Sequence, residues 1–359
     1  MSSSVSQALS AYGWDEDLEH AFTPYRETGL IPARIATVDR GLCDAITGDG
    51  PVRADTTDVA SPDPMQGPCT GDWAAVRPGR PPAVAALLPR RTAIVRASVS
   101  RDSHGQVLAA NVDTVAITIA LTARFAPGRI ERFTALAWES GARPVIVLTK
   151  ADLLPDPAEA ASLTARAAQA APGVDVAACS ATTGDGIGEA AALLTGTVVL
   201  IGPSGAGKST LGNALLGDDL LATGAVRAAD GRGRHTTVRR ELLPLPGGGV
   251  LIDTPGLRGI GLFDASEGLR QTFADIEELA AGCRFADCAH QSEPGCAVLA
   301  ALADGTLPQR RMDSYRKLLR ENEWAASRED ARLRAERGRR NREISRSVRQ
   351  SYKIKGRKP

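Results

Sequence analysis

Residues 198–217, VVLIGPSGAGKSTLGNALLG, set an apolar strand before a glycine-rich loop and a helix after it. The loop satisfies G-x-x-x-x-G-K-[ST], a pattern that is specific when a strand precedes it and a helix follows. Glycines let backbone N–H groups face phosphate oxygens, and the helix adds its positive N-terminal dipole. We expect Lys208 to reach the β- and γ-phosphates and Ser209 to coordinate Mg²⁺. The residues predicted to bind phosphate are Gly202, Gly205, Gly207, Lys208, Ser209 and Thr210.

A second phosphate-site element, LIDTPG, follows at residues 251–256. It predicts Asp253 at the end of an apolar strand, where it can hold the water shell of Mg²⁺, and the Gly256 N–H near the γ-phosphate. This D-x-x-G form is typical of GTPase switches. A transporter ATPase would need an LSGGQ segment and an acidic residue directly after Asp253, whereas Thr254 stands there.

Between these two elements, GRGRHTTVRR at 231–240 has the composition of a first switch loop. A threonine hydroxyl in such a loop coordinates Mg²⁺ only when a γ-phosphate is present. Thr236 and Thr237 are both candidates, with Thr237 preferred. Leu257 stands where many GTPases carry a water-orienting Gln. The sequence therefore predicts slow intrinsic hydrolysis, and His235 is a candidate for positioning water, or equally a solvated loop histidine.

The guanine-selecting element lies upstream of the phosphate loop, in VIVLTKADLL at 145–154. Asp152 is predicted to accept hydrogen bonds from guanine N1–H and N2–H, while the Lys150 stem packs over the ring. Thr149 takes the place of the usual Asn of N-K-x-D, and its hydroxyl can supply part of the tethering role. The expected partner is a Ser-Ala pair at the end of the next strand, where a backbone N–H meets guanine O6; the pair is Ser180 and Ala181.

The order of these motifs is therefore base element, Ser-Ala, phosphate loop, threonine switch and D-x-x-G. A conventional GTPase begins at the phosphate loop and ends at Ser-Ala. Joining those two ends and opening the chain after the second switch gives the present order without moving any strand in space. We interpret the domain as a circularly permuted GTPase whose second switch leads straight into the C-terminal region.

A cysteine and histidine cluster, CRFADCAHQSEPGC, follows that region at 283–296. Three thiolates and one imidazole make a closed tetrahedral set suited to one structural Zn²⁺ ion, with no open position for catalysis. The predicted ligands are Cys283, Cys288, His290 and Cys296. The alternative interpretation is a set of reduced cysteines without metal. The other three cysteines, Cys43, Cys69 and Cys179, are interpreted as ordinary buried or partly buried thiols.

The remaining pattern predicts a multidomain α/β chain. Short β-type runs such as PARIATVD, LCDAI, PVRADT, WAAVR and RTAIVRASV recur between turn residues and favour a five-stranded OB-type barrel. Alternating strands and helices then indicate a parallel sheet, and helices alone follow. We expect a leader at 1–30, the barrel at 31–105, the permuted GTPase domain at 106–265, a helical zinc-binding domain at 266–325 and a basic tail at 326–359.

The formal net charge of +1 conceals an asymmetry. Residues 310–359 contain 18 Lys or Arg and 7 Asp or Glu, so a basic end follows an acidic body. Such an end is typical of nucleic-acid contact, or else of a solvated helix that binds nothing. No apolar run approaches the ~20 residues that a membrane span needs, and residues 1–22 do not read as a secretory signal. We expect a soluble, cytoplasmic, monomeric protein.

Taken together, these motifs resemble the family of ribosome small-subunit-dependent GTPase A, the circularly permuted GTPases called RsgA or YjeQ. The resemblance covers about residues 30–325 and rests on LTKADL, GPSGAGKSTL, GRGRHTT, DTPGLRGIGL and CRFADCAHQSEPGCAV, with GDWAAV, LPRRTAIVR and QVLAANVDTVAI upstream. It implies an N-terminal OB-fold, a C-terminal zinc domain, and a late role in maturing the small ribosomal subunit, which stimulates GTP hydrolysis. Its implied partners are the small subunit with its rRNA, and GTP or GDP.

Two other functions stay open at this point. One is an RNA-binding assembly factor whose nucleotide is mainly structural, which Leu257 favours and intact Lys208, Ser209 and Asp253 disfavour. The other is a P-loop kinase acting on a small substrate, against which Asp152 and Ser180-Ala181 argue. The barrel is poor in aromatic residues, with Trp73 its only Trp, so we expect it to contact RNA backbone and shape rather than stacked bases.

Overall fold

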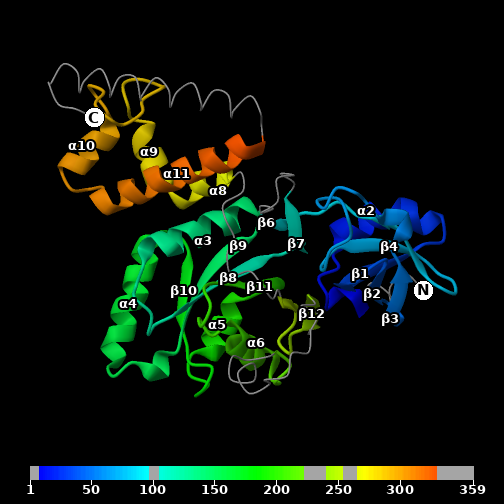
Figure 1. The fold of residues 1–359 in the computed structure, drawn as a ribbon. Helices are drawn as coiled ribbons and strands as arrows, with labels where there is room; N and C mark the ends of the chain where they lie inside the picture. Colours follow the sequence, from blue (N-terminus) through cyan, green and yellow to red (C-terminus); the bar gives the residue numbers. More distant parts are fainter. Residues whose placement is uncertain (1–7, 97–104, 222–239, 254–264, 330–359) are drawn as a thin grey trace, which may run out of the picture.

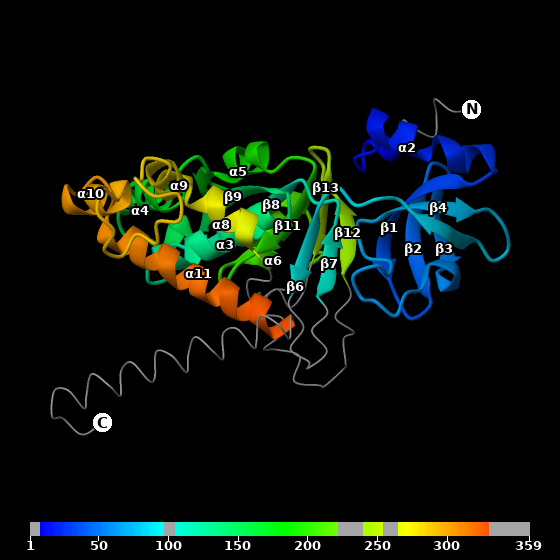
Figure 2. The same ribbon diagram turned by 90° about the horizontal axis from the view of Figure 1, so that it is seen from above.

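The computed structural model describes residues 8–96, 105–221, 240–253 and 265–329. Three bodies follow one another along the chain: a small barrel, a sheet flanked by helices, and a group of helices at the C-terminal end (Figure 1). The barrel lies at one end of the sheet, and the helical group lies against its flanking helices (Figure 2).

The barrel contains five strands in the closed order β1-β2-β3-β5-β4. Its elements are β1 (Ile31–Val38), β2 (Leu42–Thr47), β3 (Gly50–Asp55), η1 (Thr57–Val59), β4 (Trp73–Arg77) and β5 (Ala83–Leu87). The predicted strand count is confirmed, but one predicted member is wrong. RTAIVRASV supplies β6 (Ala93–Arg96), which pairs with β7 (Gln106–Ala110) in a separate two-stranded sheet. The fifth barrel strand is AVAAL, whose small residues gave a weak strand pattern.

The leader packs on the barrel through helix α2 (Glu16–Glu27), which begins where the Asp15 carboxylate accepts the Leu18 N–H at 2.9 Å. Its apolar face covers Trp73, and the Trp14 and Trp73 rings lie 4.9 Å apart, edge to face. Trp73 is only 2% exposed. This tryptophan therefore belongs to the core of the molecule and is not available for stacking on a base.

The central sheet contains six strands in the order β10-β9-β8-β11-β13-β12, parallel except for the edge strand β12. Its strands are β8 (Thr114–Ala120), β9 (Arg143–Thr149), β10 (Asp175–Ala178), β11 (Thr197–Ile201), β12 (Glu241–Pro244) and β13 (Val250–Asp253). Helices α3 (Pro127–Glu139) and α4 (Pro157–Ala170) pack on one face, and α5 (Ile187–Leu193) and α6 (Lys208–Leu216) on the other. The predicted α/β architecture is confirmed, and both faces of the sheet are buried.

The barrel is fixed to this sheet by Arg34, which is 1% exposed. Its guanidinium donates to the Thr197 hydroxyl at 2.9 Å, at the start of β11, and to the Asn111 carbonyl at 3.1 Å. The same group lies 4.7 Å from the centre of the Trp73 ring. Burial lowers the pKa of Arg34 to about 10. Since each of its three nitrogens has an acceptor, this cation holds barrel, linker and sheet in one arrangement.

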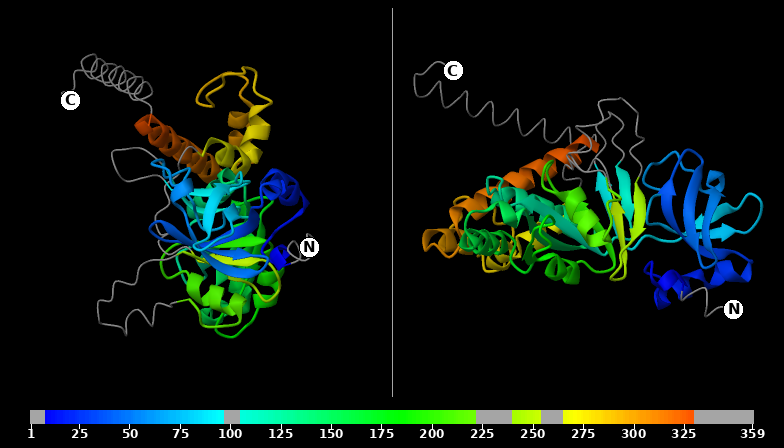
Figure 3. Two further views of the ribbon diagram at one scale, coloured as in Figure 1. Left: turned by 90° about the vertical axis from the view of Figure 1, so that its right-hand side faces the viewer. Right: turned by 90° about the horizontal axis from the view of Figure 1, so that it is seen from below.

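The C-terminal group consists of α8 (Ser266–Thr272), α9 (Ala274–Ala280), α10 (Ala297–Ala303) and α11 (Gln309–Glu329). It docks on α3, where a Cβ at Gly268 would meet the Ala135 carbonyl oxygen at 1.9 Å. Glu131 of α3, fully buried, accepts from Arg310 and Arg311 at 3.0 Å each. Figure 3 shows α11 running along this side of the sheet domain. The described part of the chain has no helix that is both long and apolar enough to cross a membrane.

Candidate functional site

The predicted nucleotide residues follow the carboxyl ends of parallel strands at one edge of the sheet. Lys150 comes directly after β9, Ser180 lies two residues beyond β10, Gly202 follows β11, and Asp253 ends β13. The register pairs Ile201 of β11 with Ile117 of β8. Ligands of open α/β sheets bind at this edge. The fold therefore gathers the upstream base element and the downstream phosphate elements into one place.

The phosphate loop has the backbone that the glycine pattern predicts. Gly202 has φ 144°, and a Cβ there would meet the Thr118 carbonyl oxygen at 2.2 Å, so only glycine lets β11 leave the sheet this close to β8. Gly207 has φ 81° and caps helix α6, which begins at Lys208. Gly205 also has a positive φ, of 77°. The loop thus ends at a helix N-terminus, whose dipole favours an anion.

Lys208 folds over this loop. Its ammonium donates to the carbonyls of Gly202 and Pro203, each at 2.9 Å. The lysine therefore links its own helix back to the start of the loop. Ser209 is half-buried at the first turn of α6, and Thr210 is exposed.

Thr149 joins the base element to the phosphate loop. Its hydroxyl donates to the Ala206 carbonyl at 2.6 Å and lies 3.4 Å from the Ile119 carbonyl. Thr149 is 2% exposed, and so is Ala206. A Cβ at Gly207 would lie 3.3 Å from the same hydroxyl. The shorter side chain in the Asn position thus ties the two motifs together directly.

The base element and the Ser-Ala turn are neighbours. The Cys179 N–H donates to the Leu148 carbonyl at 2.8 Å, and the Ala151 N–H donates to the Cys179 carbonyl at 3.2 Å. Asp152 is exposed in the short helix η2 (Ala151–Leu153). Ser180 is buried, and Ala181 beside it is half-buried.

Two of these residues have backbone-shaping roles. The Ser180 hydroxyl accepts from the Thr183 N–H at 3.1 Å, which shapes the turn. Lys150 adopts a left-handed backbone, with φ 63°. The predicted base residues are therefore brought together at the strand ends beside the phosphate loop.

Five residues predicted from the switch segments lie outside the described residues: His235, Thr236, Thr237, Gly256 and Leu257. Asp253 is described, and it is half-buried at the end of β13. Its strand pairs in parallel with β11, and Val199 there stands opposite Ile252. Asp253 therefore lies one strand away from the phosphate loop.

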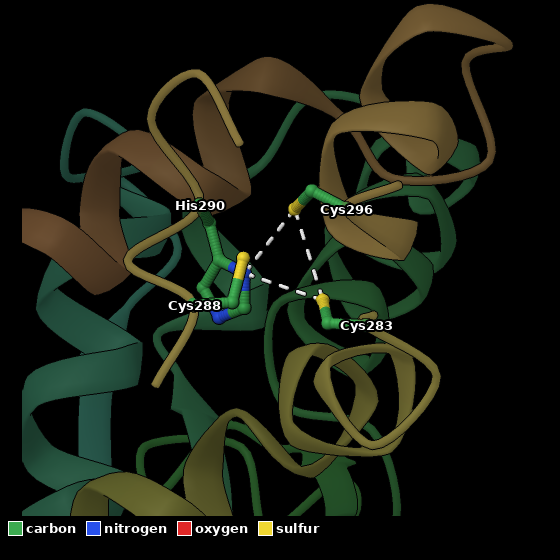
Figure 4. Close-up of side chains that lie close together, drawn as sticks. All are labelled: Cys283, Cys288, His290 and Cys296. Atoms are coloured by element: carbon green, nitrogen blue, oxygen red, sulfur yellow. Dashed lines mark hydrogen bonds between the residues drawn. The ribbon is translucent and has the colours of Figure 1, made fainter. Parts of the chain in front are cut away.

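The four predicted metal ligands meet in the loop between α9 and α10 (Figure 4). The Sγ atoms of Cys283 and Cys296 are 3.7 Å apart, and His290 Nδ1 lies 3.6 Å from the first and 3.3 Å from the second. All four ligand atoms, Cys288 included, lie within 4.8 Å of one another. A tetrahedral Zn²⁺ site with bonds of ~2.3 Å to sulfur and ~2.1 Å to nitrogen places its ligands ~3.6–3.8 Å apart. The cluster therefore has the size of a metal site.

The surrounding backbone supports this cluster. Cys296 caps helix α10, and its sulfur accepts the Leu299 N–H at 3.4 Å. The Glu293 carboxylate accepts the N–H groups of Gln291 at 2.7 Å and Ser292 at 2.9 Å, and these bonds lower its pKa to about 2. Arg316 of α11 donates to the His290 carbonyl. The sequence analysis missed the role of Glu293, although the Pro-Gly pair directly after it is a common signal of a turn.

Comparison with known proteins gives the family of this chain. The sequence profile of the RsgA GTPase family matches residues 87–263. The small ribosomal subunit biogenesis GTPase RsgA of Streptomyces coelicolor is 56% identical over 99% of this chain and 94% of its own. The protein of the same name from Streptomyces avermitilis is 58% identical over 93% of this chain and 91% of its own. The chain belongs to the RsgA GTPase family.

Solved structures support the fold of this RsgA-family chain. YjeQ from Thermotoga maritima superposes with a TM-score of 0.60 at 23% identity, over 82% of this chain and 98% of its own. YloQ, described as a circularly permuted GTPase, superposes with a TM-score of 0.59 at 22% identity, over 82% and 95%. The fold that this chain shares with YloQ agrees with the permuted order of motifs predicted from the sequence.

The three cysteines outside the cluster are buried, as predicted. Burial raises the pKa of Cys43 to about 11, of Cys179 to about 11 and of Cys69 to about 12. They are therefore protonated at neutral pH and unreactive, because the thiolate is the reactive form. These three thiols lie apart from the Cys283 cluster, whose four possible ligand atoms lie within 4.8 Å of one another.

Proposed function

We propose that this RsgA-family chain binds GTP at the carboxyl edge of its sheet and hydrolyses it to GDP and phosphate during late maturation of the small ribosomal subunit. The observation that carries the proposal is the hydrogen bond of 2.6 Å from Thr149 to Ala206, because it joins a guanine-selecting motif to a phosphate loop. The relatives that are named small ribosomal subunit biogenesis GTPases supply the process. Hydrolysis is stimulated by the subunit.

The phosphate loop holds the triphosphate in this proposal. Its backbone N–H groups, bent by Gly202, Gly205 and Gly207, bind phosphate oxygens together with the Thr210 backbone. Lys208 exchanges its two loop carbonyls for β- and γ-phosphate oxygens. Mg²⁺, when bound, neutralises charge on the β- and γ-phosphates. Ser209 supplies a hydroxyl ligand to that ion, and Asp253 orients its water shell.

Residues that follow strands β9 and β10 recognise guanine in this proposal. The Asp152 carboxylate accepts from guanine N1–H and N2–H, the Lys150 stem covers one face of the ring, and the Ala181 N–H donates to guanine O6. Ser180 acts by shaping the turn that presents this N–H, which follows from its bond to Thr183. An adenine base offers the opposite donor pattern, and its N6 amino group would lack an acceptor there.

The switch residues complete the proposal on sequence grounds. Thr237 coordinates Mg²⁺ in the GTP state, the Gly256 N–H meets the γ-phosphate, and His235 positions water in place of the Gln that Leu257 replaces. Without the subunit, this arrangement turns over slowly. Stimulation by the subunit then makes hydrolysis a timing step for release from it.

The flanking bodies supply contacts to RNA and structural support. We assign the metal of the Cys283 cluster as one structural Zn²⁺ ion, since three thiolates and an imidazole favour it. The domain limits proposed for the chain remain 31–105, 106–265 and 266–325, with the leader before them and the basic tail, 326–359, after them. The protein acts as a monomer in the cytoplasm, where its ribosomal partner is assembled.

The test is nucleotide turnover by the purified full-length protein, with GTP or ATP and with or without small ribosomal subunits. We expect slow GTP turnover alone, a many-fold rise with subunits and little turnover of ATP. If subunits bind but leave turnover flat, the nucleotide is structural and the chain is a passive assembly factor. Equal use of ATP would contradict the assignment of Asp152.

A further inference from the structure

A cavity of about 320 Å³ lies where the barrel meets the sheet domain, beside the start of the edge strand β12. Cavities of ~300–1,000 Å³ are typical of small-ligand sites. One wall comes from the barrel and the loop before β4, and the other comes from β7 and the start of β12. Its lining residues are Val38, Asp39, Pro64, Gly67, Pro68, Cys69, Thr70, Gln106, Val107 and Arg240.

Arg240 is the cationic side chain among the lining residues. It is half-buried, and it forms no ion pair with any residue in the described ranges. Burial lowers its pKa, and repulsion from Arg96 adds to the effect. A half-enclosed guanidinium of this kind is stabilised when an anion enters beside it.

The acidic groups around the cavity are already engaged. The Asp39 carboxylate binds Arg53 at 2.7 Å on the barrel surface. The buried Asp72 carboxylate, next to the lining loop, binds Arg90 through two hydrogen bonds of 2.7 and 2.8 Å. The Cys69 thiol is neutral, since burial raises its pKa to about 12. Thus none of these groups neutralises the guanidinium inside the cavity.

A second donor stands in the same lining. Gln106 accepts from the Arg96 guanidinium at 3.0 Å through its Oε1, which leaves the Nε2 amide as a hydrogen-bond donor. Thr70 adds a hydroxyl, placed 3.5 Å from the Arg240 carbonyl. Besides the Asp39 carboxylate, the lining thus offers the Arg240 guanidinium and the Gln106 amide as hydrogen-bond donors.

We propose that this cavity binds a phosphate group, held by the Arg240 guanidinium and the Gln106 amide. A planar guanidinium matches two phosphate oxygens at once, and an amide donor suits a third. The favoured source is a phosphodiester of an RNA strand that crosses from barrel to sheet domain, and this source rests on the proposed function. The site itself does not depend on that function.

The cavity lies close in sequence to a residue of the proposed nucleotide site. Arg240 directly precedes β12, and the first residue of that strand, Glu241, stands opposite Asp253 in the β12–β13 pair. A phosphate held at Arg240 therefore fixes the chain one residue away from the strand pair that ends at Asp253. Contact with RNA at the barrel is in this way connected to the strand that carries a proposed magnesium residue.

The experiment measures binding of a fluorescent ten-residue oligouridylate to the full-length protein, with GDP and Mg²⁺ saturating the nucleotide site. The variants are Arg240→Gln, Gln106→Glu and the control Arg77→Gln. The second variant places a carboxylate in the same cavity lining as the Arg240 guanidinium. Arg77 is an exposed barrel arginine paired with Asp58 at 3.3 Å. A parallel series measures the rise in melting temperature that inorganic phosphate produces.

We expect Arg240→Gln and Gln106→Glu to weaken oligomer binding about tenfold, as the loss of a charged hydrogen bond does. The slope of log K against log salt should fall by about 0.7 for one lost phosphate contact on a single strand. Arg77→Gln should change neither. Arg240→Gln should melt no lower than the wild type, because it removes an unpaired half-buried charge.

Other outcomes separate the alternatives. If oligomer binding is unchanged but inorganic phosphate stabilises the wild type and not Arg240→Gln, the phosphate site stands and its ligand is a free phosphate. If neither probe distinguishes Arg240→Gln from the wild type, the proposal is wrong. Loss of subunit binding alone would point to a protein side chain in the cavity and would also refute it. A wild type that subunits fail to stimulate refutes the proposed function and leaves the phosphate site untouched.

Discussion

Removing the Thr149 hydroxyl is the sharpest test of how the two nucleotide motifs cooperate. Thr149→Val keeps the shape of the side chain and deletes its hydrogen bond of 2.6 Å to the Ala206 carbonyl. Since Thr149 and Ala206 are each 2% exposed, water cannot easily replace the lost donor. An unsatisfied buried carbonyl costs about 1–3 kcal/mol. This cost falls on the phosphate loop, whose proposed role is to bind the nucleotide phosphates.

The expected result is weaker binding of GDP by about tenfold, because ~1.4 kcal/mol corresponds to a factor of ten. Titration of a fluorescent GDP analogue measures it, and denaturant unfolding shows how much of the cost falls on stability. Thr164→Val is the matched control, since it removes a hydroxyl bond of 2.8 Å within α4, away from the site. Thr149→Asn should restore affinity, and the preference for GDP over ADP should stay unchanged in all three variants.

If Thr149→Val binds GDP as tightly as the wild type while the Ala206 carbonyl remains buried, this hydrogen bond does not shape the phosphate loop. The loop would then hold its shape through Lys208 alone, whose two bonds of 2.9 Å to Gly202 and Pro203 are unaffected. A loss of preference for guanine in Thr149→Val would contradict a different step, namely that Asp152 carries base selection.

Three further predictions concern other parts of the chain. Asp152→Asn should lower the preference for GDP over ADP at least tenfold, measured by competition, because the carboxylate that accepts from two guanine donors is gone. Glu131→Gln should lower the free energy of unfolding by about 1–3 kcal/mol, since buried Arg311 loses one charged acceptor and keeps Asp275, whereas the half-buried control Glu321→Gln should cost under about 1 kcal/mol. Cys288→Ser, or chelation, should release one zinc per chain by metal analysis and lower the helical signal in circular dichroism.

The sequence allowed most of the sheet and the nucleotide motifs to be predicted, because each motif lies next to the strand that positions it. Periodic apolar runs marked β8, β9, β10, β11 and β13, and all were found. The edge strand β12 was missed, because ELLP is short and only one of its four residues is buried. The β6–β7 pair was divided between two predicted domains, since strand partners cannot be read from apolar runs alone.

Long-range side-chain contacts were beyond sequence reasoning for a different reason. Glu131 and Arg311 are 180 residues apart, and each looks like an ordinary charged residue on the surface of an amphipathic helix. Both are buried only because α11 lies against α3. The tether from Thr149 to Ala206 spans 57 residues, and the Asn position suggested a role for Thr149 without naming its acceptor. Sequence patterns thus predict candidate ligand-binding residues well. They predict poorly the buried contacts that position those residues.

In the permuted order, the predicted second switch leads directly into the C-terminal helices. The buried contacts of those helices therefore bear on the proposed function. The second-switch segment begins after Asp253, at the nucleotide edge, and ends before Ala265. The Ala265 N–H donates to Asn322 of α11 at 2.7 Å, and α8 begins one residue later, against α3. Because buried Glu131 and Arg311 join α11 to α3, the described residues on both sides of this segment are attached to the sheet domain. In the proposed function, a change of nucleotide beside Asp253 therefore acts on a chain whose next described residue, Ala265, is hydrogen-bonded to α11.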